Sequence, residues 1–252
     1  MTTLSPGRST ALEATEAADR EYAPLLLLLT GVSGVVDAVS FLAFGRAFAA
    51  AQTGNLVFLG FLAVGAPGFA AVSLITSVTA FFVGAFTAGR TIVRRAPNRT
   101  RLLRNFALAE LVPLAAAAVL AGSVVARGIV APVPLLLGLV AFGIGVQAAG
   151  AARMRVPGLE RTLVLTTTLQ YVAVDSFADP ENRTISVRWI ASIFVLVGGA
   201  AVGAALLLHL GPAVPLAVAT GMVAVVVALA YRLDDPARPR AVADRSGVPS
   251  IA

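Results

Sequence analysis

Eight apolar stretches account for most of the chain, and short polar, glycine- or proline-containing connections separate them. Several of these stretches reach the about 20 residues that an α-helix needs to cross the hydrocarbon core of a bilayer. The pattern therefore predicts an all-α polytopic membrane protein. The stretches cover residues 24–44, 47–65, 68–89, 105–126, 131–152, 162–178, 189–208 and 212–231.

Two stretches are interrupted by polar residues. Residues 47–65 contain the run from Gln52 to Asn55, and residues 162–178 contain three consecutive threonines followed by Gln170 and Asp175. Backbone that leaves the helical conformation at membrane depth is stable only where protein or water satisfies its polar groups. We therefore expect about six transmembrane helices and two short discontinuous or re-entrant segments.

Within the first interrupted stretch, Gly54 is expected to hold a turn, because glycine adopts backbone conformations that other residues avoid. Thr53 or Asn55 would then cap a half-helix that begins at Leu56. Free N–H groups at such a helix start favour an anion or a polar solute. The alternative is an ordinary spanning helix with a mild kink.

The arginines indicate whether the interrupted stretches cross the membrane. All 19 basic residues are arginine. If all eight stretches cross, the arginines divide almost evenly between the two sides. If both interrupted stretches enter and leave on one side, every arginine except Arg46 and Arg127 lies on the side of the termini. Because positive charge concentrates on the cytoplasmic side, we predict the second topology, with both termini in the cytoplasm and the chain in a bacterial plasma (inner) membrane.

This topology divides the chain into two units of one plan, each with a span, an interrupted segment and two further spans. The predicted parts are a polar cytoplasmic tail (1–23), a first membrane unit (24–126), a second membrane unit (127–231) and a disordered cytoplasmic tail (232–252). The first unit would start inside and the second outside. The units are therefore compatible with an inverted repeat, a plan that recurs among transporters.

Composition narrows the function further. Apolar residues make up 58% of the chain and charged residues 13%, against about 25% charged residues in soluble domains. With no cysteine and one histidine, the chain offers no thiolate or histidine-rich metal site, and neither a metal nor a cofactor is predicted. The net charge of +6 comes from loop arginines, as the membrane topology requires, so nucleic-acid binding is not expected.

Two longer motifs resemble a known family. The stretch GVSGVVDAVSFLAFGRAFAAAQTGNLVFLG resembles the N-terminal signature of the YoaK family of bacterial multi-pass membrane proteins, in which a glycine-rich helix with an aspartate precedes T-G-N. The stretch GVQAAGAARMRVPGLERTLVLTTTLQYVAVDS resembles its second signature, with Gln170-Tyr171 in place of the usual T-G. The resemblance implies about six membrane spans and no established reaction or substrate.

Asp37 is the strongest functional candidate, because a carboxylate in a membrane segment costs several kcal/mol unless it is paired, hydrated or protonated. Thr30, Ser33, Asp37 and Ser40 recur at helical spacing and form one polar stripe. That stripe is expected to line a cavity or to meet the re-entrant piece. The alternative role for Asp37 is structural, fastening its helix to the broken backbone around Gly54.

Three other polar residues lie in or near the spans. Gln147 is expected to face a pore or to join helices through hydrogen bonds. Asp175 is expected near the cytoplasmic end of its segment. Glu110 is either a proton site or, as we favour from the sequence, a partner of Arg101 or Arg104.

The leading functional hypothesis is a transporter or channel for a small polar solute, with proton coupling as one option and a homo-oligomer as a compatible assembly. The alternative is a non-transporting membrane scaffold or sensor. An enzyme is not predicted, because no metal cluster, cysteine or Ser–His pair suggests one. The predicted solute or ion pathway consists of Asp37, Gln52, Thr53, Gly54, Asn55, Gln147, Thr166, Thr167, Thr168 and Asp175.

Overall fold

The computed structural model describes residues 6–129, 132–157, 159 and 183–234, and regular structure in this part of the chain is entirely helical. The predicted all-α fold is therefore confirmed. The elements are α1 (Pro6–Ala43), α2 (Gln52–Ala63), α3 (Ala71–Ala88), the short π-helix η1 (Gly89–Val93), α4 (Arg99–Ala126), α5 (Val133–Met154), α7 (Arg183–Leu210) and α8 (Ala213–Leu233).

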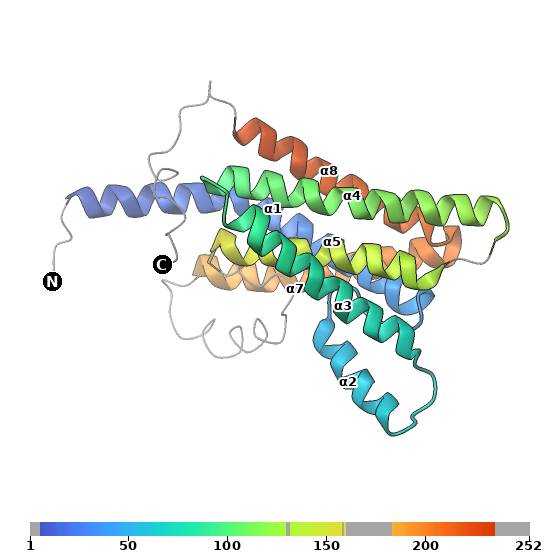
Figure 1. Ribbon diagram of the computed structural model, residues 1–252. Coiled ribbons are helices and arrows are strands. Elements are labelled where there is room, and N and C mark those ends of the chain that lie inside the picture. Colours follow the sequence, from blue (N-terminus) through green and yellow to red (C-terminus); the bar gives the residue numbers. More distant parts are fainter. Residues whose placement is uncertain (1–5, 130–131, 158, 160–182, 235–252) are drawn as a thin grey trace.

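Six of the described helices are long and apolar enough to cross a membrane, as the apolar pattern predicts. The first span begins at Asp19, although α1 itself extends back to Pro6 and projects beyond the bundle (Figure 1). By contrast, α2 has 12 residues. At 1.5 Å per residue such a helix is about 18 Å long, well short of a hydrocarbon core of about 30 Å. We conclude that α2 does not span.

The connections place α2 at one end of the bundle (Figure 1). Helix α1 ends and α3 begins at the same end, so residues 44–70 leave the bundle and return at that end. Likewise α5 ends and α7 begins at the opposite end. The segment 162–178, predicted to be the second interrupted piece, lies outside the described residues, as does the C-terminal tail from residue 235.

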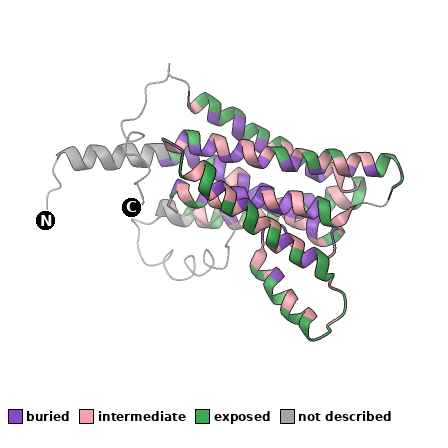
Figure 2. Ribbon diagram, viewed as in Figure 1, coloured by how far each residue is buried: buried purple, intermediate pink, exposed green. Residues whose placement is uncertain are grey.

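Helices α1 and α5 form the centre of the bundle (Figure 2). About two thirds of the α1 span is buried (67%), and α5 is similar (61%), whereas only 11% of the α7 span is buried. The outward faces of α3, α7 and α8 expose large apolar side chains such as Phe82, Phe194 and Val225. A bundle with an apolar exterior is the arrangement expected for a protein whose solvent is lipid.

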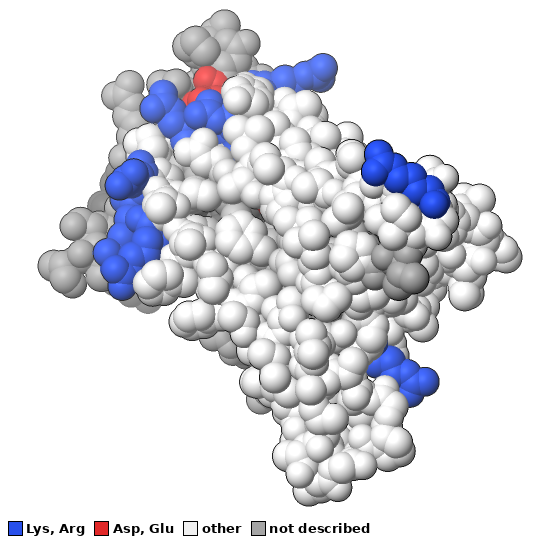
Figure 3. All heavy atoms as spheres, turned by 45° about the vertical axis from the view of Figure 1, so that its right-hand side comes forward, with Lys and Arg blue, Asp and Glu red and all other residues white. Residues whose placement is uncertain are grey.

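Charged side chains gather at the ends and leave a broad uncharged surface between them (Figure 3). At the end that carries the start of α4, Arg99 lies 2.6 Å from the Asp19 carboxylate, and Arg104 lies 2.7 Å from that of Asp234. The Asn98 side chain accepts a hydrogen bond from the Arg101 N–H and so caps α4. These contacts tie α1, α4 and α8 together outside the apolar layer.

Glycines bring α1 and α7 into close contact. A Cβ on Gly34 would collide with the Leu196 carbonyl oxygen and the Ala200 nitrogen. A Cβ on Gly199 would collide with the carbonyl oxygen of Gly31, three residues before Gly34. Only residues without a side chain permit this backbone approach, which is typical of packing between membrane helices.

The contact between α5 and α3 repeats this arrangement residue for residue. A Cβ on Gly145 would collide with the Phe81 carbonyl oxygen and lie 3.0 Å from the Ala85 nitrogen. A Cβ on Gly84 would collide with the carbonyl oxygen of Phe142, three residues before Gly145. The first helix of each predicted unit thus packs on the third element of the other unit, and the two pairs run in opposite directions (Figure 1).

Candidate functional site

Asp37 holds a stretch of backbone that has left the helical conformation. Its carboxylate accepts hydrogen bonds from the N–H groups of Ala50 at 2.6 Å and Ala51 at 3.2 Å. Next to it, the Ser40 hydroxyl accepts from the Ala49 N–H at 3.0 Å. Two side chains of α1 thus satisfy three consecutive N–H groups. Asp37 precedes the end of α1 by six residues, so this contact lies about 9 Å inside the bundle end.

Asn55 completes the fold of the same segment from the other direction. Its side-chain oxygen accepts from the Phe48 N–H at 2.8 Å, and its amide donates to the Phe48 carbonyl at 2.7 Å. The amide also lies within hydrogen-bond distance of Gln52 Oε1 and of the Ser77 hydroxyl on α3. Asn55 is fully buried. Its amide acts as a clamp that gives residues 48–55 one conformation.

Gln52 and Ser77 connect this clamp to α3. The Gln52 amide donates to the Ala49 carbonyl at 2.8 Å and lies 3.1 Å from the Ser77 hydroxyl, which in turn donates to the Phe48 carbonyl. Sequence reasoning missed Ser77. The available signal was the Ser73–Ser77 pair, two serines one helical turn apart in a largely apolar stretch, and both are buried.

Residues 44–63 will be called the re-entrant segment. Its aromatic side chains pack against α1 and the loop before α3, with ring centroids 4.6 Å apart for Phe41 and Phe48 and 4.8 Å apart for Phe58 and Phe69. The polar clamp and the aromatic cluster together fix α2, which leans away from the bundle (Figure 1).

The predicted details of this segment are wrong in three respects. Helix α2 begins at Gln52 rather than at Leu56, and its N-cap residue, Ala51, has no side-chain cap. Thr53 lies within the helix and is exposed. Gly54 is also helical and is absent from the positive-φ residues of the described chain; a Cβ there would instead lie 3.1 Å from the Phe48 ring. Asp37, on α1, instead binds the N–H groups of Ala50 and Ala51 just before the helix, and so fixes the backbone from which α2 starts.

The polar stripe of α1 contacts two different parts of the molecule. Asp37 and Ser40 contact the re-entrant segment, which is one of the two positions expected for this stripe from the sequence. Ser33 faces α5, where the Gln147 amide donates to the Ser33 hydroxyl at 3.0 Å and approaches the Leu29 carbonyl at 3.2 Å. Gln147 is fully buried and joins α5 to α1, which is the interhelical role weighed for it from the sequence. Its carbonyl oxygen, Oε1, has no partner in the described chain.

The predicted ion pair between Glu110 and an arginine is wrong. Arg104 binds Asp234, and Arg101 Nε lies 3.6 Å from the same carboxylate. Glu110 instead points into the bundle, is fully buried, and has no hydrogen-bond partner for either oxygen among the described residues. The competing acceptor for both arginines, Asp234, lies in the segment that was assigned to a disordered tail.

The remaining predicted pathway residues, Thr166, Thr167, Thr168 and Asp175, lie outside the described residues. The structure therefore brings together Asp37, Gln52 and Asn55, and places Gln147 in a separate contact between α1 and α5. Among the residues with described positions, no three histidine, aspartate or glutamate side chains are grouped so that they could hold a metal ion.

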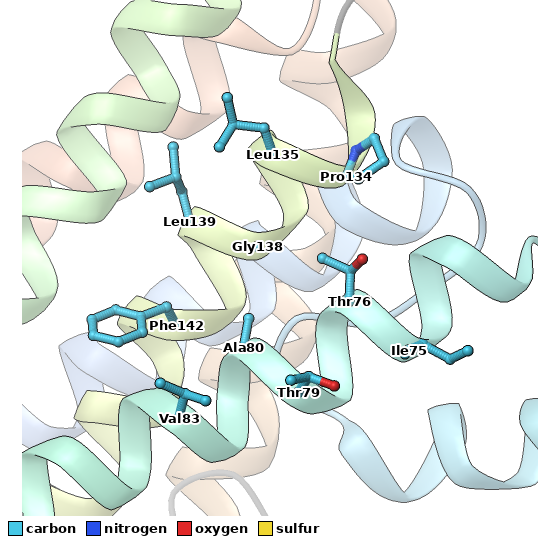
Figure 4. A pocket seen from close by; sticks show the side chains of 10 residues that line it. All are labelled: Ile75, Thr76, Thr79, Ala80, Val83, Pro134, Leu135, Gly138, Leu139 and Phe142. Carbon is cyan, nitrogen blue, oxygen red and sulfur yellow. The ribbon is translucent and has the colours of Figure 1, made fainter.

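A groove of about 540 Å³ lies between α3 and α5 (Figure 4). Its walls are mainly apolar, with Val83, Leu135 and Phe142 among them, and Thr76 and Thr79 supply its hydroxyl groups. The exposed side chains of Ile75, Val83 and Leu135 among its lining residues place the groove on the apolar outer surface. Its apolar lining and position on the outer surface suit contact with lipid.

Comparison with known proteins agrees with this architecture. A family model described as "Protein of unknown function (DUF1275)" matches residues 25–229. The chain belongs to this family. The UPF0700 transmembrane protein YoaK of Bacillus subtilis (strain 168) is similar to this DUF1275 chain, with 32% identity over 155 residues, or 60% of this chain and 65% of the relative. No solved structure matches. The resemblance to the YoaK family is thus confirmed, and this DUF1275 protein is a multi-pass membrane protein.

Proposed function

We propose that this protein is a transporter for a small polar solute in a bacterial plasma membrane. The observation that carries the proposal is the recurrence of one glycine packing pattern in the α1–α7 and α3–α5 pairs, which run in opposite directions. An inverted repeat produces such a pattern, and inverted repeats with broken helices support alternating access in many transporters.

The re-entrant segment supports the same proposal. It brings the backbone of residues 49–51 to membrane depth, where an intramembrane carboxylate and a serine hydroxyl bind it. Irregular backbone of this kind occurs in membrane proteins where it is buried in protein or lines a cavity. In the proposed transporter, Asp37 fastens the segment, and the segment forms one wall of the solute pathway.

The proposal is tested by solute uptake into proteoliposomes. The purified protein is expected to accelerate saturable uptake of at least one member of a panel of labelled amino acids, sugars, polyols and organic acids. The control is the Asp37→Ala variant, in which the re-entrant segment loses its fastening. Uptake no faster than in protein-free liposomes for the whole panel would refute the transport proposal.

The second candidate is the non-transporting scaffold or sensor, and one observation favours it. Both oxygens of Asp37 accept hydrogen bonds from backbone N–H groups, which is the pattern expected if the acid has only a structural role. Failure of the uptake experiment with a stable, monodisperse protein would support this candidate.

We also propose that the end of the bundle bearing α1's N-terminal extension faces the cytoplasm. The support is the arginine distribution, because Arg46 and Arg127 lie in the connections at the opposite end of the bundle. The chain has no cysteine, so single introduced cysteines report cleanly. Cysteines replacing the exposed residues Arg46 and Val64 should both react with an impermeant maleimide from outside, and one replacing Arg95 only from inside. Labelling of Arg46→Cys and Val64→Cys from opposite sides would refute the re-entrant topology.

A further inference from the structure

Glu110 occupies a position where packing would call for an apolar residue. It lies on the buried face of α4 with Phe106, Ala107 and Leu114, all of which have 0% exposure. Glu110 is also fully buried, and neither carboxyl oxygen has a hydrogen-bond partner within the described ranges. An ionisable group inside a membrane bundle is costly and is by default a functional candidate.

Glu110 lies at a close contact between α4 and α5. Gly143 of α5 faces this part of α4, so that a Cβ on it would lie 3.3 Å from the Pro113 ring and 3.4 Å from the Glu110 carbonyl oxygen. Pro113 lies inside α4 and has no N–H, so the Ala109 carbonyl loses its usual helical donor. Helix kinks are commonly found at proline, so α4 can bend next to this contact with α5.

The charged and titratable groups on the neighbouring elements are engaged or lie toward the ends of their helices. On α4, Arg104 is bound to Asp234. On α5, Arg153 lies in the last turn, and on α8 Tyr231 and Arg232 lie near the C-terminal end. On η1, Arg90 contacts the Phe86 ring, and on α1 Asp37 is bound to the re-entrant segment. None of them partners the Glu110 carboxyl.

A second unsatisfied polar atom lies on the facing helix. Gln147 follows Gly143 by four residues, one helical turn along α5, and its Oε1 lacks a partner among the described residues. A neutral carboxyl group donates one hydrogen bond, whereas an ionised one only accepts. Only the neutral form of Glu110 could donate to an acceptor, and no arginine forms an ion pair with it among the described residues.

We propose that Glu110 is a proton-binding site that governs the contact between α4 and α5. In the packed state the carboxyl is neutral, because an isolated ionised carboxylate without a partner is strongly disfavoured in an apolar interior. When α4 moves away from α5 and water enters, the carboxyl releases its proton to that water and becomes ionised. Reprotonation permits the helices to close again. The site is separate from Asp37, and its protonation is measurable without any solute.

The direct test is infrared difference spectroscopy of the reconstituted protein against its Glu110→Gln variant. At neutral pH the difference spectrum is expected to contain the carbonyl stretch of a neutral carboxyl group, and that band should persist in the Asp37→Asn background. A carboxylate band in its place at neutral pH would overturn the proposal.

The coupling to helix movement is tested with a cysteine at Ala107, which is buried on the same face of α4 one turn before Glu110. Its reaction with a water-soluble thiol reagent should rise with pH more steeply than thiol ionisation alone explains. In the Ala107→Cys/Glu110→Gln variant the reaction rate should rise with pH only as thiol ionisation does. Equal pH profiles in the two backgrounds would overturn the coupling, and Glu110→Leu provides a second background should the glutamine variant be poorly produced. A failed uptake experiment leaves both readouts intact, so the two proposals fail independently.

Discussion

Asp37 and Glu110 are both carboxyl groups inside membrane-spanning helices, but their surroundings are opposite. Asp37 is only partly buried and accepts two backbone hydrogen bonds, one of them at 2.6 Å. Glu110 is fully buried and has no partner in the part of the chain that is described. A satisfied acid is explained by the structure that it stabilises. An acid without partners lowers the stability of the fold, and no structural contact explains its presence. It is therefore the better candidate for proton binding.

The largest effect is expected from Asp37→Ala. The substitution leaves the N–H groups of Ala50 and Ala51 without their acceptor, and each unsatisfied buried donor costs about 1–3 kcal/mol. The free energy of unfolding in detergent should therefore fall by roughly 2–4 kcal/mol. Asp37→Asn should lose less, because one oxygen remains as an acceptor. An unchanged unfolding free energy for Asp37→Ala would show that Asp37 does not fasten the re-entrant segment.

The second-largest loss in unfolding free energy is expected from Asn55→Ala. Asn55 is buried and binds both the N–H and the carbonyl group of Phe48, so its removal leaves one buried donor and weakens the bonding of one acceptor. The expected loss in unfolding free energy is about 1–3 kcal/mol. The matched control is Leu56→Ala at the next position, which is 58% exposed. If both substitutions cost the same, the amide clamp contributes nothing beyond ordinary contacts.

A smaller loss is expected for Gly54→Val. The residue is helical, so no special backbone conformation is at stake, but a Cβ would lie 3.1–3.2 Å from the Phe48 ring. The ring must shift, which suggests a loss of roughly 1 kcal/mol in unfolding free energy. Leu56→Val, an apolar trim of an exposed residue, should cost less. Equal melting temperatures would mean that Phe48 accommodates the larger residue freely.

Much of the fold could be predicted from the sequence. The apolar pattern, its two polar interruptions and the arginine positions together predicted six spans, and they indicated that residues 47–65 do not cross, in agreement with the 12-residue α2. The polar run from Gln52 to Asn55 also located the re-entrant segment. These predictions succeed because bilayer thickness sets the length of a span and positive charge sets its orientation, and both can be counted along the sequence.

The partners of the polar residues could not be predicted in the same way. The sequence favoured pairing Glu110 with Arg101 or Arg104, because they are close along the chain. In the structure, both arginines instead form ion pairs with Asp234 at the end of α8. The sequence also favoured a local cap for α2, whereas α2 has no side-chain cap and Asp37 on α1 binds the backbone just before it. Both errors arise from contacts between residues distant in sequence, which only the packing of the bundle determines.

The contrast between the two acids is tested most directly by the unfolding free energies of Glu110→Gln, Glu110→Leu and Asp37→Asn, measured side by side in one detergent. Replacing a buried acid that lacks partners removes an unfavourable group, so both Glu110 variants should be as stable as the parent protein or more stable. Asp37→Asn should be less stable than the parent. If the Glu110 variants lose as much stability as Asp37→Asn, then Glu110 is a structural acid as well, and its proposed role as the proton site is contradicted.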